Sequence, residues 1–361
     1  MSIVITKQPT GGPFNAYDAG TELDLEFGVD AGTPEVAIIT INDVELPNIY
    51  PDINGNFYYN LKAAVTAIIN ENHFNDELEV IDENFKEDPS LFKEIEIVIN
   101  VLFVDVAEDE TTIVLPFLKS IGQKYYSEEF TFLVPKISQN AEVIYYKGYP
   151  MDIAIYSKTP TAGIRTYTIK NKRTGISTTK DFVKGVSRLF LGDGVVDLND
   201  FEQEVPLYLG ANDMEFSYNG SIVATLTIHK KEASCGKLLK WFNPAGGWSY
   251  FRFLPFEIDD LSSDTMENFN NHGVNTITGK EAERELELNT GVIDAAEYRI
   301  LETLLLSPKV YIYDQKPFQP FALSNFKEVE VTTKSLSRAT KYQTGSYTIK
   351  LLMPNVYTQT L

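Results

Sequence analysis

Short stretches in which apolar and polar residues alternate dominate the chain, and this period of two predicts a mostly β protein. The clearest is Leu23–Val29, where apolar side chains at odd positions alternate with Glu22, Asp24, Glu26 and Gly28. One face of such a strand is buried and the other is solvated. Further strands are expected at Ile3–Ile5, Val36–Ile41, Ile95–Val106, Thr111–Leu118, Glu128–Val134, Met151–Tyr156, Ile164–Lys170, Val310–Tyr313, Lys327–Thr333 and Ser346–Leu352.

Two segments change to the helical period. In Leu61–Ile69 the apolar residues fall at i, i+3, i+4, i+7 and i+8, which places them on one face of a helix. In the second segment, Asp294 precedes Glu297 at the spacing of a capping box, and Ser307-Pro308 ends the helix. Its apolar face consists of Tyr298, Leu301, Leu304 and Leu305.

Turn signals predict how some strands pair. Asn219-Gly220 joins Asp213–Tyr218 to Ile222–His229 as a β-hairpin, because Asn-Gly favours the tight turns that hairpins use. Asn54-Gly55 predicts another hairpin turn before Phe57–Tyr59, and the acidic Glu108–Glu110 is expected to be the turn of a third hairpin. Asn171–Gly175 is expected to be a turn after the strand Ile164–Lys170.

At 361 residues the chain exceeds what one hydrophobic core serves, so we expect three domains. The expected fold class is mainly β with a few short helices. It comprises β-sandwich-like domains over residues 1–127 and 128–234, and an α+β domain with a Trp/Gly strand–turn–strand module over residues 235–361. Asp259–Thr278 is expected to be an extended polar loop, and the polar segments Val80–Ser90 and Asp259–Gly273 are candidates for arms that order on assembly.

Charge and composition exclude several classes of function. With 51 acidic and 31 basic residues the net charge is −20, which disfavours binding to nucleic acid and to anionic membranes. We expect no disulfide, because Cys235 is the single cysteine. Residues 1–14 lack the features of a signal peptide, so we expect synthesis in a cytoplasm without export by that route.

Motifs for catalysis and cofactors are missing from the sequence. Gly236-Lys237 lacks the upstream glycine of a phosphate-binding loop, and one cysteine with three scattered histidines does not suit zinc. No Gly-x-Ser-x-Gly elbow is present, and His229 is interpreted as a solvated residue at a strand end. We therefore expect no enzyme activity, no cofactor and no metal.

Calcium remains a minor alternative at two acidic clusters, although neither completes a calcium loop. The clusters are Asp52, Asn54 and Asn56, and Asp197, Asn199 and Asp200.

The segment from Lys240 to Phe253 is the most informative part of the sequence. It contains both tryptophans, on either side of a Pro/Gly turn. The two interpretations are anchors in a core or an interface, which we favour, and an aromatic platform for sugar. The candidate anchor residues are Trp241, Trp248, Tyr250, Phe251 and Phe253.

This segment, with Asn243 and Gly246-Gly247 between the tryptophans, resembles a module in tail-associated structural proteins of phages and prophages of Bacteroidota. The N-terminal opening, with Ile3–Ile5 and Pro9, and the C-terminal Glu297–Val310 segment are similar to the same group. The resemblance implies β-sandwich domains, location in the virion tail and ring-like homo-oligomers with other virion proteins as partners. It implies no catalytic residues.

The first functional hypothesis is therefore a tail-tip, baseplate or neck/collar ring subunit. A glycan-binding adhesin that uses Trp248 and Tyr250 is the alternative. A glycan hydrolase with a carboxylate pair, for which acidic residues such as Asp193, Glu202, Glu257 and Asp260 are candidates, comes last.

Overall fold

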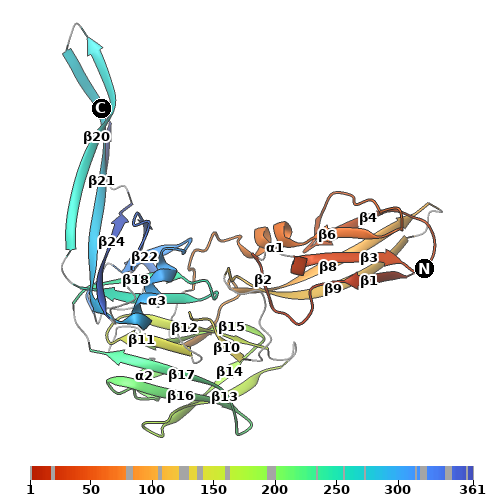
Figure 1. The fold of residues 1–361 in the computed structure, drawn as a ribbon, viewed down its shortest axis with the longest axis horizontal. Helices are drawn as coiled ribbons and strands as arrows, with labels where there is room; N and C mark the ends of the chain where they lie inside the picture. The colour runs from red at the N-terminus through yellow and green to blue at the C-terminus, as the bar shows by residue number, and fades with distance from the viewer. Residues whose placement is uncertain are drawn as a thin grey trace.

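The computed structural model shows a chain built mostly of strands, arranged in three units (Figure 1). It describes residues 2–17, 21–78, 84–104, 108–121, 130–135, 141–158, 163–192, 201–232, 235–254, 257–271, 274–313, 315–317, 323–337, 344–354 and 357–360. The expectation of a mainly β protein with few short helices is confirmed.

The N-terminal unit is a sandwich of two sheets. The smaller has the order β1-β3-β6, from β1 (Ile3–Lys7), β3 (Asp24–Val29) and β6 (Phe57–Asn60). The larger has the order β2-β9-β8-β4-β5, from β2 (Phe14–Asn15), β9 (Glu108–Leu118), β8 (Phe92–Phe103), β4 (Pro34–Ile41) and β5 (Val44–Glu45). One short 3-10 helix, η1 (Thr21–Leu23), precedes β3, and the expected helix is present as α1 (Lys62–Ile69). Its Val65 and Ile69 are buried against the core of this unit.

Two turn predictions for this unit are wrong in part. The turn at Gly55 exists, with a φ of 81°, but β6 pairs with β3 and not with the strand before the turn. The acidic residues Glu108–Glu110 lie within β9, where they pair with the end of β8. The alternation of apolar and polar positions predicts strands well, but it does not predict which strands become neighbours.

The middle unit is a second sandwich. Its central sheet has the order β10-β12-β15-β7, from β10 (Phe130–Phe132), β12 (Met151–Ser157), β15 (Gly185–Gly192) and β7 (Phe85–Glu87). The facing sheet has the order β11-β17-β16-β13-β14, from β11 (Ala141–Tyr146), β17 (Ser221–Lys231), β16 (Gly210–Tyr218), β13 (Arg165–Asn171) and β14 (Ser177–Phe182). The short helix α2 (Phe201–Glu204) lies between β15 and β16 in the chain. The strands β16 and β17 form the hairpin predicted at Asn219-Gly220.

Every residue of β12 and β15 is buried, on both faces of the central sheet. One face packs on the facing sheet, and the other contacts Asp76 and Phe92, in the described part of the segment 71–92, and the C-terminal unit. The strand β7 lies in this segment, so part of Val80–Ser90, expected to be an arm that orders on assembly, is a strand of the middle unit. Residues 79–83 are outside the described part of the chain.

The C-terminal unit contains a sheet of eight strands, ordered β19-β18-β22-β23-β24-β21-β20, with β25 paired to β21. The strands are β18 (Lys237–Phe242), β19 (Trp248–Phe253), β20 (Glu257–Asn271), β21 (Val274–Ile293), β22 (Val310–Tyr313), β23 (Phe326–Val331), β24 (Gly345–Leu352) and β25 (Tyr357–Thr360). The predicted helix is α3 (Ala295–Leu304), and η2 (Leu323–Asn325) is a short 3-10 turn. Both bonds of the capping box form, between Asp294 and Glu297.

The polar stretch Asp259–Thr278 was expected to be a loop, and this prediction is wrong. It forms most of a long antiparallel hairpin, β20 with β21, that projects from the body (Figure 1). We call this hairpin the arm. The stretch 259–278 carries no regular alternation of apolar and polar residues, which is the pattern that predicts a half-buried strand.

Two hydrophobic cores hold the molecule. One lies inside the N-terminal unit. The other is continuous through the middle and C-terminal units. The domain boundaries expected at 127/128 and 234/235 lie in segments outside the described residues.

Candidate functional site

The Trp/Gly segment forms an antiparallel pair, β18 with β19, as its sequence pattern suggests. All five candidate anchor residues, Trp241, Trp248, Tyr250, Phe251 and Phe253, are buried in the large core. Trp241 is 0% exposed and Trp248 is 3% exposed. Their ring faces are therefore covered within the chain, and they do not form the exposed platform that stacking on a sugar requires.

The tryptophans connect the strands of this unit to its helix and to a basic side chain. The indole Nε1–H of Trp241 donates to Thr303 Oγ1 on α3 at 2.9 Å. The Lys240 ammonium lies 4.7 Å from the centroid of the Trp248 ring, a cation–π contact in a site shielded from water. Trp241, Lys240 and Trp248 are buried and Thr303 is partly buried, so both interactions contribute to the rigidity of the C-terminal unit.

The turn between the two strands contacts both other units. The carbonyl of Pro244 accepts from the N–H of Ile121 at 3.1 Å, at the end of the N-terminal unit. Asn243 is fully buried, and its amide donates to the carbonyl of Leu133 in the middle unit at 3.2 Å. Its Oδ1 accepts from the N–H of Ala245 at 2.9 Å, which holds the turn in shape. The turn is therefore a joint among three units.

The joint requires a glycine at position 247, because the backbone of the middle unit approaches it closely. A Cβ placed on Gly247 would lie 2.3 Å from the carbonyl oxygen of Leu133 and 3.1 Å from Ala154 Cβ.

We expect Gly247→Ala to lower the free energy of unfolding by about 1–3 kcal/mol, because the added methyl overpacks the joint. Urea unfolding followed by circular dichroism measures the change. The exposed Ser221→Ala is the control, expected within about 0.5 kcal/mol of the wild type. Equal stability of Gly247→Ala and the wild type would contradict the close approach.

A cluster of buried charges lies beside this joint. Arg188 on β15 is completely buried and makes bidentate bonds to Asp152, at 2.8 and 2.7 Å, and to Asp76, at 2.6 and 3.1 Å. A third carboxylate, on Asp88, accepts from it at 3.3 Å. Lys240 also binds Asp76, and the Tyr250 hydroxyl binds Asp152. We call these six residues the charge cluster.

Members of the charge cluster come from all parts of the chain. Asp76 and Asp88 precede β8, Asp152 and Arg188 lie on the central sheet, and Lys240 and Tyr250 come from the Trp/Gly segment. Burial alone would raise the pKa of Asp76, but the charges of Arg188 and Lys240 outweigh it and hold this pKa well below its usual range. Three carboxylates thus face two cations, and ion pairs shielded from water tie the middle unit to the C-terminal unit and to Asp76 in the segment that follows α1.

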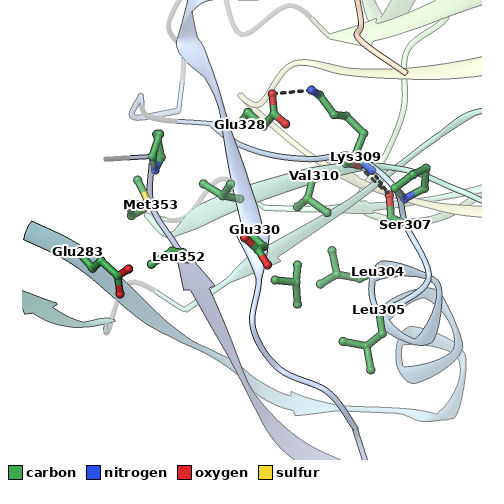
Figure 2. Close-up of a pocket in the computed structure, with 14 residues that line it drawn as sticks. Glu283, Leu304, Leu305, Ser307, Lys309, Val310, Glu328, Glu330, Leu352 and Met353 are labelled. Atoms are coloured by element: carbon green, nitrogen blue, oxygen red, sulfur yellow. Dashed lines mark hydrogen bonds and ion pairs between the residues drawn. The ribbon is translucent and has the colours of Figure 1, made fainter. Parts of the chain in front are cut away.

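An open groove of about 580 Å³ lies where the arm joins the body (Figure 2). Its apolar lining includes Leu304, Val310 and Leu352. Carboxylates of Glu283, Glu328 and Glu330 line it as well, and Lys309 pairs with Glu328 at 2.5 Å. Among the described residues that line the groove there is no histidine and no cysteine.

The minor candidates for chemistry have structural explanations. Asp52 accepts from the backbone N–H groups of Asn54 and Asn56, both at 2.8 Å, so it closes its own turn. His229 is partly exposed at a strand end and faces Glu142 at 3.4 Å, and Cys235 is exposed. In the described part of the chain, no cluster of three or more potential metal ligands occurs. The second calcium candidate, 197–200, lies outside it, as does Asp193.

Comparisons with known proteins do not assign a family. No protein-family model matches the chain. No curated protein matches it either. In the described residues, no helix is long and apolar enough to cross a membrane.

Some solved structures align with the chain, all at low similarity. A tetra-tandem repeat from the extending region of a large adhesion protein shares 11% identity over 82% of this chain, with a TM-score of 0.23. The SGBP-B protein of the Bacteroides ovatus mixed-linkage glucan utilization locus shares 9% identity over 71% of it, with a TM-score of 0.18. The chain spans 60% of the length of each of these two structures. The N-terminal eight Ig domains of the Down syndrome cell adhesion molecule align over 79% of this chain and 40% of theirs, with 9% identity and a TM-score of 0.20.

Proposed function

We propose that the chain is a structural subunit of a larger protein assembly, a ring of identical subunits in a phage tail. The tail tip, the baseplate and the neck are the candidate positions. The observation that carries this proposal is the arm. The sequence resemblance to tail-associated proteins of Bacteroidota phages supports the choice of a tail.

The arm is unusual for a protein that acts alone. Its strands, Glu257–Asn271 and Val274–Ile293, are 15 and 20 residues long, whereas strands commonly have five or six residues. The strand β20 is the last of its sheet, so its outer backbone groups have no strand neighbour among the described residues. Exposed sheet edges of this kind pair readily with another chain.

Stability gives a second reason to expect a partner. A two-stranded hairpin alone is marginally stable in water, because it buries little apolar surface. The strand β25 supports β21 only at Gly279–Ala282, and β24 supports it only at Glu285–Ile293. On the side of β20, Ile258 and Leu261 are exposed. Contact with a neighbouring subunit would cover both the edge and these side chains.

Shortening the arm tests the proposal. Residues 264–281 are replaced by Asn-Gly, which joins the paired positions Ser263 and Ala282 by a tight turn. We expect the body to fold as in the full chain, because the core residues of β21, Leu286, Leu288 and Ile293, lie outside the replaced segment. We expect oligomers of the full chain, measured by light scattering over a range of concentrations and by electron microscopy, to be lost.

A pair of proline substitutions gives the matched control. Along a strand, backbone N–H groups point alternately toward and away from the neighbouring strand, and proline lacks this group. Of the two neighbouring residues Leu261 and Ser262, one therefore has its N–H on the free edge of β20 and the other has it inside the hairpin. Proline at the free-edge position removes an outward donor and leaves the hairpin bonds intact, whereas proline at the other position breaks a hairpin bond. We expect the free-edge variant to fold and to lose assembly. A full chain that stays monomeric at every concentration, or a shortened chain that assembles as well, would overturn the proposal.

A further inference from the structure

The charge of the chain is divided unequally along its length. Residues 1–118 contain 23 acidic and four basic residues, whereas residues 119–361 contain 28 and 27. Nearly all of the net charge of −20 therefore lies in the first third of the chain. Between residues 8 and 61 there are nine acidic residues and neither lysine nor arginine.

The N-terminal unit ends in a rigid apolar tip. Ser2 binds the side chain of Asp30, so the N-terminus marked in Figure 1 lies at this end, away from the body. Ile53 is 101% exposed and Tyr50 is 71% exposed. The turn that carries Ile53 is fixed by the Asp52 carboxylate and by a bond from the Gly55 N–H to the Asp52 carbonyl at 3.0 Å.

Further exposed residues complete this end of the sandwich. The ring of Pro34 packs against Gly55, and the N–H of Val104 donates to the carbonyl of Thr33 at 3.3 Å. Val104 and Glu35 are exposed there. We call Glu35, Tyr50, Asp52, Ile53 and Val104 the distal tip. Hydrogen bonds to backbone N–H groups hold the pKa of Asp52 below its ordinary value, so the tip is negatively charged.

A surface of complementary character lies on the middle unit. The turn between β13 and β14 carries Lys172 and Arg173, and exposed Ile176, Tyr208 and Leu209 lie at the same end of the sheet. The guanidinium of Arg173 lies 5.0 Å from the centroid of the Tyr208 ring and donates to the carbonyl of Leu209 at 3.0 Å. These five residues form the basic turn surface, in which cations border exposed apolar side chains.

We propose that the distal tip of one copy docks onto the basic turn surface of a second copy. The tip presents apolar residues bordered by carboxylates, and the turn presents apolar residues bordered by cations. Local contacts of this kind persist in physiological salt, which screens the mutual repulsion of the two acidic chains beyond about 8 Å. Figure 1 shows the N-terminal unit extending away from β13 and β16, so the two surfaces face different directions in one molecule.

This geometry makes the contact heterologous, since each copy offers a different surface to each neighbour. Heterologous contacts close into a ring when the rotation between neighbours permits it. The inference names a second contact between the subunits of the proposed ring, and it rests in part on that proposed function. It differs in the surface involved, because the ring requires this contact in addition to the contact made by the arm.

Single substitutions at the tip test the docking. We expect Ile53→Ser to weaken self-association by about thirtyfold, the effect of removing one central apolar anchor. Ile53 is fully exposed, so the fold is expected to be unchanged. Ile222→Ser, at a different exposed position of the middle unit, is the matched control and is expected to leave association unchanged. Light scattering and sedimentation over a range of concentrations measure the dissociation constant.

Charge reversal with rescue identifies the partner surface. Glu35→Lys and Lys172→Glu are each expected to weaken association, and the double variant is expected to restore most of it. Loss from both single variants without rescue would overturn the pairing of these two surfaces. Self-association of Ile53→Ser as strong as that of the wild type would overturn this pairing as well. If shortening the arm abolishes assembly while every tip variant assembles normally, the ring function stands and this docking does not.

Discussion

Replacing Arg188 with methionine is expected to lower the free energy of unfolding by about 3–5 kcal/mol, because it leaves buried carboxylates without their cation. Arg188 is 0% exposed and bonds to three carboxylates, on Asp76, Asp88 and Asp152. After the substitution Lys240 is the one cation of the charge cluster that remains to balance them. Urea unfolding followed by circular dichroism is the measurement.

The control for Arg188→Met is the exposed Lys172→Met, which breaks an ion pair to Glu215 at the surface. Pairs of this kind contribute about 0–1 kcal/mol, so a small loss is expected. A loss in Arg188→Met no larger than in the control would show that the charge cluster does not hold the units together.

The effect of Arg188→Met is also expected to depend on pH. The folded-state pKa of Asp76 lies below that of an unfolded chain, which is about 3.9. A group whose pKa is depressed on folding contributes stability that is complete above the unfolded pKa and is lost as the pH falls through the folded pKa. The difference in stability between the wild type and Arg188→Met should therefore be largest near neutral pH and shrink below about pH 4.

The second large effect is expected for Trp241→Ala. Truncating a fully buried aromatic side chain costs about 3–5 kcal/mol, since contacts are lost and a cavity remains. Trp241→Phe keeps most of the volume and loses the bond to Thr303, so a loss of about 1–2 kcal/mol is expected. Equal losses in the two variants would show that the hydrogen bond and not the packing dominates. Tyr58→Ala, at an exposed position, is the control.

The parts of the structure that the sequence predicts are those with local causes. The strand Asp24–Val29 follows from its alternation, and the α3 cap follows from the spacing of Asp294 and Glu297. The Trp/Gly strand–turn–strand follows from a Pro/Gly turn between two aromatic stretches, Lys237–Phe242 and Trp248–Phe253. In each case neighbouring residues determine the conformation.

The parts that the sequence does not predict depend on distant partners or on solvent. The charge cluster joins Asp76 to Arg188, residues 112 positions apart, and nothing near either residue indicates the other. The stretch Asp259–Thr278 lacks the alternation of a half-buried strand, so its sequence resembles a loop although its described residues pair as strands. Gly247 lies in a Pro/Gly segment that predicts a tight turn, but its close approach to Leu133 does not follow from spacing.

The position of β7 has a consequence for the order in which the chain folds during synthesis. The N-terminal unit can close once β9 has left the ribosome, because its core involves no later residue. The strand Phe85–Glu87 is made before that point, yet its neighbour β15 begins only at Gly185. Asp76 and Asp88 are likewise synthesised long before Arg188, the cation with which they pair. A nascent chain therefore carries an unpaired strand and two uncompensated acids for roughly a hundred residues, about 5–20 s at ordinary rates of translation.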